Sequence, residues 1–400
     1  MNSTVRDCII VGGGVSGVTL AHYLRAAGRD PLVIEKEVRP GGRLQSHRLP
    51  GSDFIVETGA HTCYNGYASL LHIARRLPVV PQPLVPLPYL LDSRGQLAPL
   101  VSAIPFPSLC LNLTKILFLS KEGKSVRDYY RRLFGARAYD RLFSRAFRAV
   151  ICQQADDYPA TMLLKKRKQR ADDFPRKYSF AGGLQALVEA IVEQSAIPLA
   201  TGDPATAIHR DANRVYIVET ASGRRFHSRA VALALDPAAA SLLLRPVAPA
   251  AADLLATIPL SRVDSLSIVA RREDVPARPL SGVIPLRDDY LSIVSADPLA
   301  HPLYRAFTLH SAGGTLPPDK QLAVATALLG VSPSSVVATW NARHLLPSTR
   351  IEHARLAEQL LATTRHSGIY ITGNYFLGLS IEDCVNRSRA EASRFIDENA

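Results

Sequence analysis

The chain has 400 residues, of which 47% are hydrophobic, and it carries a formal net charge of +12. This length and composition predict two globular domains, each with its own core, and argue against a disordered chain. The positive charge suits an acidic substrate, an anionic membrane surface or nucleic acid, and a cofactor with two phosphates favours it equally. Charge alone therefore excludes none of these partners.

The cysteines indicate a reducing, cytoplasmic setting. The five residues are odd in number, widely spaced and form no C-x-x-C pair, so we expect free thiols and neither a disulfide framework nor a metal site. The first apolar strand begins within about seven residues of the N-terminus, which predicts that there is no cleavable secretory signal.

The segment with the clearest chemistry is the beginning of the chain. A short β-branched run over residues 7–11 leads into a glycine turn and then into an apolar helical pattern that continues to Leu24. Strand, turn and helix together predict the first unit of a dinucleotide fold, whose backbone N–H groups and helix N-terminus bind a pyrophosphate. The cofactor contacts predicted for this turn are Gly12, Gly14, Val15, Ser16 and Gly17.

A second apolar strand over residues 31–34 ends at Glu35, eighteen residues past Gly17. A carboxylate at this position accepts the hydroxyl groups of an adenosine ribose. Lys36, which follows directly, is assigned to the same site. The two strands, the turn, the helix and the acid together predict nucleotide binding.

The next two stretches decide between nucleotides. Residues 39–44 and 56–62 resemble the segments that run along the diphosphate and under the flavin in the FAD-dependent amine oxidase and protoporphyrinogen oxidase superfamily. A dehydrogenase that uses only NAD has no reason to carry them, so the resemblance implies FAD. The cofactor contacts that it implies here are Gly42, Arg43, Gly59, Ala60, His61 and Thr62.

An apolar passage over residues 97–119 is interrupted by prolines and a lysine, so it is too broken to span a bilayer as a helix. Two interpretations stay open: it forms walls of an apolar substrate pocket, or it is a patch that contacts a membrane surface. Residues 126–151 have the spacing of amphipathic helices. The basic run 165–170 is interpreted as a solvated helix end, not a nucleic-acid contact, because no aromatic residues are interleaved with it.

From residue 178 the pattern returns to the nucleotide fold, with a helix, strands joined by a hairpin and a buried strand over 231–235. Ala205, in the first of these strands, is assigned to the cofactor site. Residues 238–256 predict a helix pair, and residues 258–340 predict short strands of a mixed sheet.

The last segment predicts a strand over 367–374 that ends at a glycine, followed by a helix that begins near Gly378. The N-terminus of that helix would offer N–H groups to flavin or phosphate oxygens. The cofactor contacts predicted here are Gly373, Asn374, Leu379, Ser380 and Ile381.

The predicted fold class is α/β, with a discontinuous Rossmann-like FAD-binding domain and an α+β substrate-binding domain. The FAD-binding domain is predicted over 1–78, 178–257 and 341–400. The substrate domain is predicted over 79–177 and 258–340, with a helical block at 122–152.

Over its whole length the chain resembles the protoporphyrinogen (coproporphyrinogen) oxidase branch of this superfamily, most specifically over residues 373–384. The resemblance implies non-covalent FAD, removal of a hydride from a C–H of a large apolar substrate, and dioxygen or another electron acceptor. A flavin amine or amino-acid oxidase is the alternative, and a flavin-bound scaffold without catalysis is a third hypothesis. Nucleic acid is not expected as a partner, and a peripheral membrane contact stays open.

Two residues are candidates for catalysis. His61 would lie near the flavin if its stretch follows the family, where it could orient the substrate or take a proton. The alternative is a histidine that only makes structural hydrogen bonds. Tyr375, after the glycine of the last strand, could wall the substrate site, and the alternative is a core residue.

Overall fold

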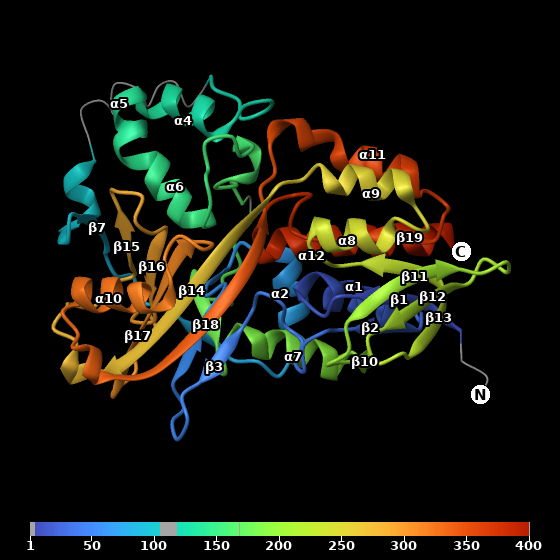
Figure 1. The fold of residues 1–400 in the computed structure, drawn as a ribbon, viewed down its shortest axis with the longest axis horizontal. Coiled ribbons are helices and arrows are strands. Elements are labelled where there is room, and N and C mark those ends of the chain that lie inside the picture. Colours follow the sequence, from blue (N-terminus) through green and yellow to red (C-terminus); the bar gives the residue numbers. More distant parts are fainter. Residues whose placement is uncertain (1–4, 105–117, 168, 400) are drawn as a thin grey trace.

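The computed structural model describes residues 5–104, 118–167 and 169–399 (Figure 1). Two sheets organise the chain, one beside both termini and the other beside a block of helices (Figure 1). Residues 105–117, the centre of the apolar passage, lie outside the described ranges. The α/β fold class predicted from the sequence is confirmed.

The first sheet has the strand order β10-β2-β1-β13-β12-β11, and β19 also pairs with β13. Its strands are β1 (Arg6–Val11), β2 (Pro31–Ile34), β10 (Leu199–Ala200), β11 (Ala205–Arg210), β12 (Tyr216–Thr220), β13 (Arg225–Leu233) and β19 (Ile369–Ile371). β1 pairs in parallel with both β2 and β13. Its apolar run is buried on both faces, as expected for a central parallel strand.

Helices cover both faces of this sheet (Figure 1). On the face of Cys8 and Ile10 lie α1 (Val15–Ala26), α2 (Ala68–Ala74), α7 (Leu184–Gln194) and α12 (Ile381–Glu398). On the face of Ile9 and Val11 lie α8 (Pro237–Leu244), α9 (Pro249–Ala256) and α11 (Leu356–Thr364). The expected helix pair over 238–256 is thus confirmed as α8 and α9.

The second sheet has the strand order β18-β14-β17-β16-β15-β7-β8. Its strands are β7 (Tyr89–Ser93), β8 (Gln96–Pro99), β14 (Leu260–Arg271), β15 (Gly282–Pro285), β16 (Ser292–Ser295), β17 (Tyr304–Ala312) and β18 (Val336–Pro347). α10 (Pro318–Leu329) packs on one face. The other face is turned toward a hairpin of β3 (Ser46–Arg48) and β4 (Ile55–Glu57).

Two expectations about this sheet were wrong. β14 and β18 each have 12 residues, so they are not short strands. β18 also continues to Pro347, beyond the predicted domain boundary at residue 340. β18 is an edge strand whose side chains alternate between partly covered and exposed, so it has no continuous apolar run that would mark its end.

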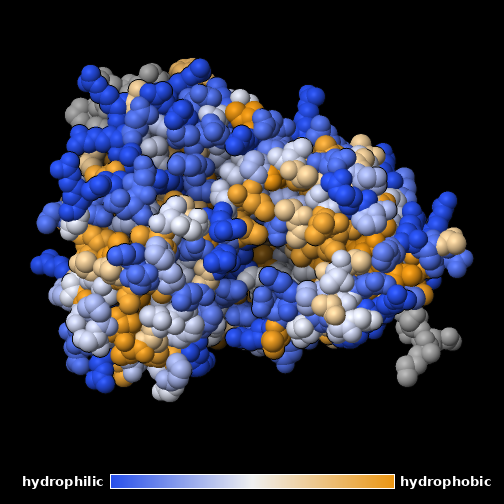
Figure 2. Space-filling model, viewed as in Figure 1, coloured by the Kyte–Doolittle hydropathy of each residue, from blue (hydrophilic) through white to orange (hydrophobic). Residues whose placement is uncertain are grey.

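The helical block contains α4 (Val126–Phe134), α5 (Ala136–Ala138), a π-helical turn (Tyr139–Phe143) and α6 (Ser144–Ile151). The Ser125 side chain caps α4 by accepting a hydrogen bond from the Asp128 N–H. Aromatic residues form the inside of the block, and its outer face is mainly hydrophilic (Figure 2). Buried Arg148 of α6 pairs with Asp288 and thereby ties the block to the second sheet.

The interpretation of residues 165–170 as a solvated helix end was wrong. Lys165 and Arg167 both pair with Asp383, which is 3% exposed, at distances of 2.8 and 3.4 Å. Their positive charges therefore balance the buried carboxylate of Asp383 at the start of α12. In the described part of the chain, no helix is both long and apolar enough to cross a membrane.

Candidate functional site

The N-terminus of α1 is open to an anion. Gly14 precedes the helix in an extended conformation, no side chain caps it, and its first turn contains no acid. The first N–H groups of a helix lack intrahelical partners, and Val15, Ser16 and Gly17 supply them here. A Cβ added to Gly14 would meet only Gly42 Cα, at 3.7 Å, so another molecule can approach the backbone closely.

Two other glycines shape this turn. Gly12 has φ +107°, and a Cβ there would lie 2.6 Å from the Ala234 carbonyl oxygen. A Cβ on Gly17 would lie 1.9 Å from the Gly12 carbonyl oxygen, so only glycine lets α1 begin this close to β1.

Glu35 lies beside the turn and is 6% exposed. One carboxylate oxygen accepts a hydrogen bond from Gly13 N at 2.6 Å, and the other accepts one from Glu37 N at 2.9 Å. Each carboxylate oxygen has a second lone pair, so the group can still accept from two hydroxyls. Lys36 instead has an exposed side chain that pairs with Glu37, so the structure turns it toward solvent.

β11 begins near the same edge of the sheet. The Asp203 N–H donates to the Glu35 carbonyl oxygen at 3.3 Å, and Ala205 follows as the first residue of the strand. The structure therefore brings Ala205 toward the ribose end of the predicted site.

The glycine pair and the stretch after β4 meet at the turn. Gly41 forms a parallel β-bridge with Gly14, and Gly42, at φ +59°, directly faces Gly14. A Cβ on Gly59 would lie 2.0 Å from the Arg43 carbonyl oxygen, which also accepts a hydrogen bond from Ala60 N at 3.3 Å. His61 and Thr62 continue from there, partly buried.

Arg43 reaches across to the second sheet, where its guanidinium donates to the Leu345 carbonyl oxygen of β18. Burial lowers the pKa of Arg43, against the opposing effects of nearby Cys384, Asp236 and Tyr375. Among the described residues Arg43 has no ion-pair partner. A cation withdrawn from water is costly unless an anion accompanies it, so this position suits a negatively charged ligand.

The C-terminal segment lies against the same turn. Gly373 has φ +155° and Asn374 is 8% exposed. Ser388 of α12 donates to the Ser16 carbonyl oxygen at 2.7 Å, so α12 runs alongside α1.

The start of α12 is capped by its own side chains. The Ser380 hydroxyl accepts a hydrogen bond from Asp383 N at 3.2 Å and donates one to the Asp383 carboxylate at 2.7 Å, so Ser380, one of the predicted cofactor contacts, is already paired. Ile381 packs into the core, and Leu379 contacts the helical block.

The structure places Tyr375 in the core and not at an open surface. Its side chain is 1% exposed and packs with Phe376 in the core under α8, α9 and α11. It has no free surface for a substrate. The alternative interpretation, a core aromatic residue, describes its position.

Three histidines meet between the two sheets, and the sequence analysis identified only His61. Burial lowers the pKa of His310 on β17 to about 3, helped by nearby His344 and His61. His344 on β18 donates its Nε2–H to the Thr58 carbonyl oxygen at 3.0 Å. The three histidines are far apart in sequence. The only local sign of this cluster was a histidine inside an apolar strand.

A family model described as flavin containing amine oxidoreductase matches residues 15–396. The chain belongs to this family. The match covers the helical block and every strand of the two sheets except β1, and membership makes the chain a flavin-dependent oxidoreductase.

Individual relatives of this family agree in fold and differ in coverage. Protoporphyrinogen oxidase, chloroplastic, of Oryza sativa subsp. japonica is 23% identical over 98% of this chain and 88% of its own length. FAD-dependent oxidoreductase oblC of Cochliobolus heterostrophus is 33% identical, over 21% of this chain and 17% of that protein. The solved structure of a proposed protoporphyrinogen oxidase from Exiguobacterium sp. 255-15 has a TM-score of 0.75 and 16% identity, and covers 99% of this chain and 100% of that one.

The described residues fit the flavin that the family uses. The uncapped start of α1 offers N–H groups, Glu35 retains lone pairs for hydroxyls, and Arg43 lacks a carboxylate partner. These three groups come from one continuous stretch of the flavin oxidoreductase chain, folded around the Gly14–Gly41 bridge.

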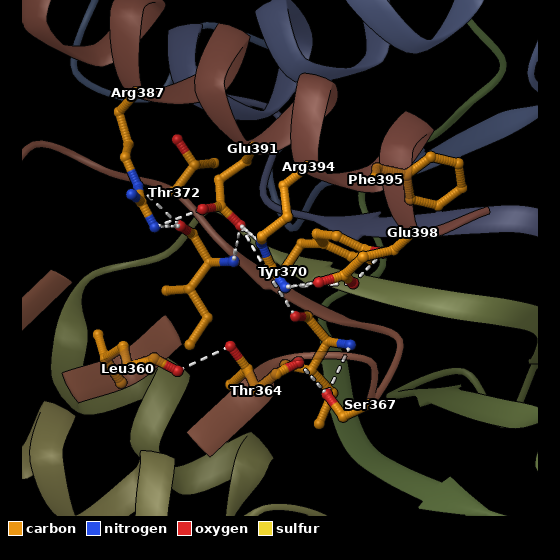
Figure 3. Close-up of polar contacts among 12 residues, drawn as sticks. Leu360, Thr364, Ser367, Tyr370, Thr372, Arg387, Glu391, Arg394, Phe395 and Glu398 are labelled. Atoms are coloured by element: carbon orange, nitrogen blue, oxygen red, sulfur yellow. Dashed lines mark hydrogen bonds and ion pairs between the residues drawn. The ribbon is translucent and has the colours of Figure 1, made fainter. Parts of the chain in front are cut away.

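β19, which leads into Gly373, is held from one side by the side chains of α12 (Figure 3). Arg394 donates to the Ile369 carbonyl oxygen at 2.8 Å, and Arg387 donates to the Ile371 carbonyl oxygen at 3.0 Å. Glu391 accepts from Ile371 N at 3.3 Å and pairs with both arginines. In this flavin oxidoreductase, three charged side chains of α12 therefore make the hydrogen bonds that a neighbouring strand would make with this edge of β19.

Proposed function

We propose that the chain binds FAD without a covalent link and oxidises a C–H group of a large apolar substrate of the porphyrinogen class, with dioxygen as the electron acceptor. When bound, the flavin supplies the acceptor for a hydride from the substrate carbon. The observation that carries the proposal is that the uncapped start of α1, Glu35 and the glycine stretch meet at one bridge, and that Arg43, which follows this stretch, has no ion-pair partner among the described residues. Similarity to a protoporphyrinogen oxidase over nearly the whole chain supports the substrate class.

Each part of the chain then has a task. The turn at Gly12–Gly17 and the start of α1 hold the diphosphate, and Arg43 neutralises part of its charge. Glu35 accepts hydrogen bonds from the ribose. We assign FAD binding to the first sheet and its helices, and substrate binding to the second sheet, through Pro347, with the helical block.

The substrate side is enclosed by residues from both units. Leu379 packs on the helical block, and Leu142 of the π-helical turn packs with Ile284 of β15 in the second sheet. We propose that apolar walls of this kind exclude water from the reacting carbon. His61, whose pKa burial lowers below its ordinary value, is kept neutral and orients the substrate or accepts a proton.

An amine or amino-acid oxidase is the second candidate, favoured by the family description and by the neutral histidines between the sheets. A neutral imidazole hydrogen-bonds an uncharged amine without a charge penalty. A contact of residues 97–119 with a membrane surface is a separate proposal about location.

Anaerobic reduction of the bound flavin tests these alternatives. Purified protein is mixed with coproporphyrinogen III, protoporphyrinogen, benzylamine or a set of amino acids, and flavin absorbance is followed. We expect bleaching by a porphyrinogen and restoration of the colour by air. Bleaching by amines alone would refute the porphyrinogen class in favour of amine substrates. Bleaching by none of the probes would refute the proposed oxidation.

A further inference from the structure

One face of the second sheet changes from apolar to polar along its strands. At one end, Val269, Ala306 and Ala338 pack against the β3–β4 hairpin. At the other end the side chains are hydroxyl groups and an imidazole, although they are almost fully buried: Ser265 at 1%, Ser267 at 0%, Ser292 at 3%, Thr308 at 5% and His310 at 5% exposed. Buried polar groups cost stability unless they are hydrogen-bonded, so a hydrogen-bond partner is expected for each of them.

One pair at this end is complete. Ser267 and Thr308 are 2.7 Å apart, and the Thr308 hydroxyl donates to the Glu57 carbonyl oxygen at 3.1 Å. Ser267 therefore donates to Thr308, and both hydroxyl hydrogens have acceptors. This pair ties the sheet to β4 and has no hydrogen left for a ligand.

The neighbouring pair is incomplete. Ser265 Oγ and His310 Nδ1 are 2.7 Å apart, and within the described ranges the Ser265 hydroxyl has no other partner. The tautomer that leaves the fewest hydrogens without an acceptor has this hydroxyl donating to Nδ1, with the hydrogen of the neutral imidazole on Nε2. Among the described residues, His310 Nε2 has no hydrogen-bond partner.

The surroundings of His310 are polar and uncharged. His344 and His61 lie near enough to depress the pKa of His310 further, after burial. Ser292 lies directly opposite His310 on β16, and its hydroxyl has only the thiol of Cys152, a weak partner, beside it. His310 thus carries an unpartnered ring nitrogen on the same face as Ser292, whose hydroxyl also lacks a strong partner, and this pairing indicates a place for a ligand atom.

We propose that His310, oriented by Ser265, is a positioning residue on the polar face of the second sheet, and that its Nε2–H donates a hydrogen bond to an acceptor atom of the substrate. The acceptor is an unprotonated amine nitrogen or a carboxylate oxygen. This proposal rests on the proposed function, because it places the substrate between the two sheets.

Nuclear magnetic resonance of ¹⁵N-histidine in the oxidised holoenzyme tests the hydrogen bond without turnover. The His310 signals, assigned with His310→Gln, should show hydrogen on Nε2, and titration with benzoate or benzylamine should shift them. A shift caused by benzoate would identify the acceptor as a carboxylate oxygen, and a shift caused by benzylamine would identify it as an amine nitrogen. Hydrogen on Nδ1, or signals that neither probe moves, would overturn the proposal whether or not the flavin can be reduced.

The kinetic arm uses Ser265→Ala, His310→Leu and His310→Gln, with Ser267→Ala as the matched control from the complete pair. With the probe that reduces the wild-type flavin, His310→Leu should raise the substrate Kd about tenfold, and Ser265→Ala by a smaller factor. Gln retains an N–H donor, so His310→Gln should recover part of the affinity. Ser267→Ala should leave Kd unchanged.

Equal Kd values for wild type, Ser265→Ala and His310→Leu would refute the role of the pair. Failure of every probe to reduce wild-type flavin would refute the proposed function instead, and the spectroscopic arm would then decide the hydrogen bond alone.

Discussion

Glu57 is a partly buried acid near the flavin site that stabilises the fold. Its carboxylate accepts hydrogen bonds from Leu184 N at 2.7 Å and from the Ser46 hydroxyl at 2.8 Å. Leu184 begins α7, and Gly183 before it has no side chain that could cap the helix. Glu57 therefore caps α7 from a distant part of the chain, whereas Arg43 nearby is left without an anion.

The pH dependence of stability should report on Glu57. Burial raises its pKa from 4.5 to about 7, although the two hydrogen bonds oppose the shift. A raised folded-state pKa means that the stabilisation is complete below pH 4.5 and is lost as the pH rises through 7. Glu57→Gln should remove this dependence, which we expect to amount to about 2 kcal/mol, below the full value of about 1.4 kcal/mol per pKa unit because the side chain is partly exposed.

Urea unfolding of wild type and Glu57→Gln at pH 5 and pH 8 measures the effect. Glu37→Gln, at an exposed position, is the control and should follow wild type. Parallel pH profiles for wild type and Glu57→Gln would show that the carboxyl titrates normally.

Glu35→Ala should weaken FAD binding. The variant removes the hydrogen bonds to the ribose, worth about 1.5 to 3 kcal/mol, which corresponds to about tenfold to over a hundredfold in affinity. It also frees Gly13 N and Glu37 N, which the carboxylate now holds. Quenching of FAD fluorescence gives the Kd, with Glu37→Ala as the exposed control. An unchanged Kd would show that another acid binds the ribose.

The helix α12 makes two sets of contacts: it packs against α1, and its side chains hydrogen-bond the backbone groups at the free edge of β19. The paired side chains Arg387, Glu391, Arg394 and Glu398 are all at most 15% exposed. Arg394 also stacks on the Tyr370 ring, 4.2 Å from its centroid. Breaking a buried network leaves charges without partners, which is costlier than losing an exposed pair.

Glu391→Ala should therefore destabilise the protein by about 3 to 5 kcal/mol. Asp253→Ala removes an exposed pair with Arg245 on the neighbouring helices and should cost at most about 1 kcal/mol. Denaturant midpoints of the two variants make the comparison. Similar small shifts for both would mean that water reaches the β19 edge.

The elements that the sequence predicted well are those whose signals are local. The Gly12–Gly17 turn, Glu35 and the start of α12 follow from contiguous residues with known stereochemistry. The length of β18 and the meeting of His310 with His61 do not, because an edge strand has no continuous apolar pattern and the histidines meet only after two sheets pack. Tyr375 was assigned to the site because it follows a glycine, but its packing in the core depends on helices that are distant in sequence.

At the scale of the molecule, polar contacts join the flavin side to the second sheet, and Arg43 makes one of them, from the glycine stretch to β18. A bound dinucleotide would add contacts to the turn, to the ribose acid and to Arg43 at once. Ligands that bind only the folded state stabilise it in proportion to their concentration relative to Kd.

Removal of FAD should therefore lower the unfolding temperature by several degrees. At a free FAD concentration about 100 times Kd, the stabilisation is about 2.7 kcal/mol. Differential scanning fluorimetry of stripped and reloaded protein measures it. Riboflavin lacks the diphosphate and should restore little, so equal recovery with riboflavin would contradict the role of the α1 N-terminus.

The pairing of α1 with α12 also sets the order of events during synthesis. The phosphate turn near residue 12 leaves the ribosome early, but β13, β19 and the helix that flanks α1 are encoded up to residue 398. A nascent chain therefore holds the turn without the walls that shape it until α12 emerges. We expect cofactor loading to follow the synthesis of α12, and a chain that terminates before residue 381 to lose its flavin site even though every glycine of the fingerprint is present.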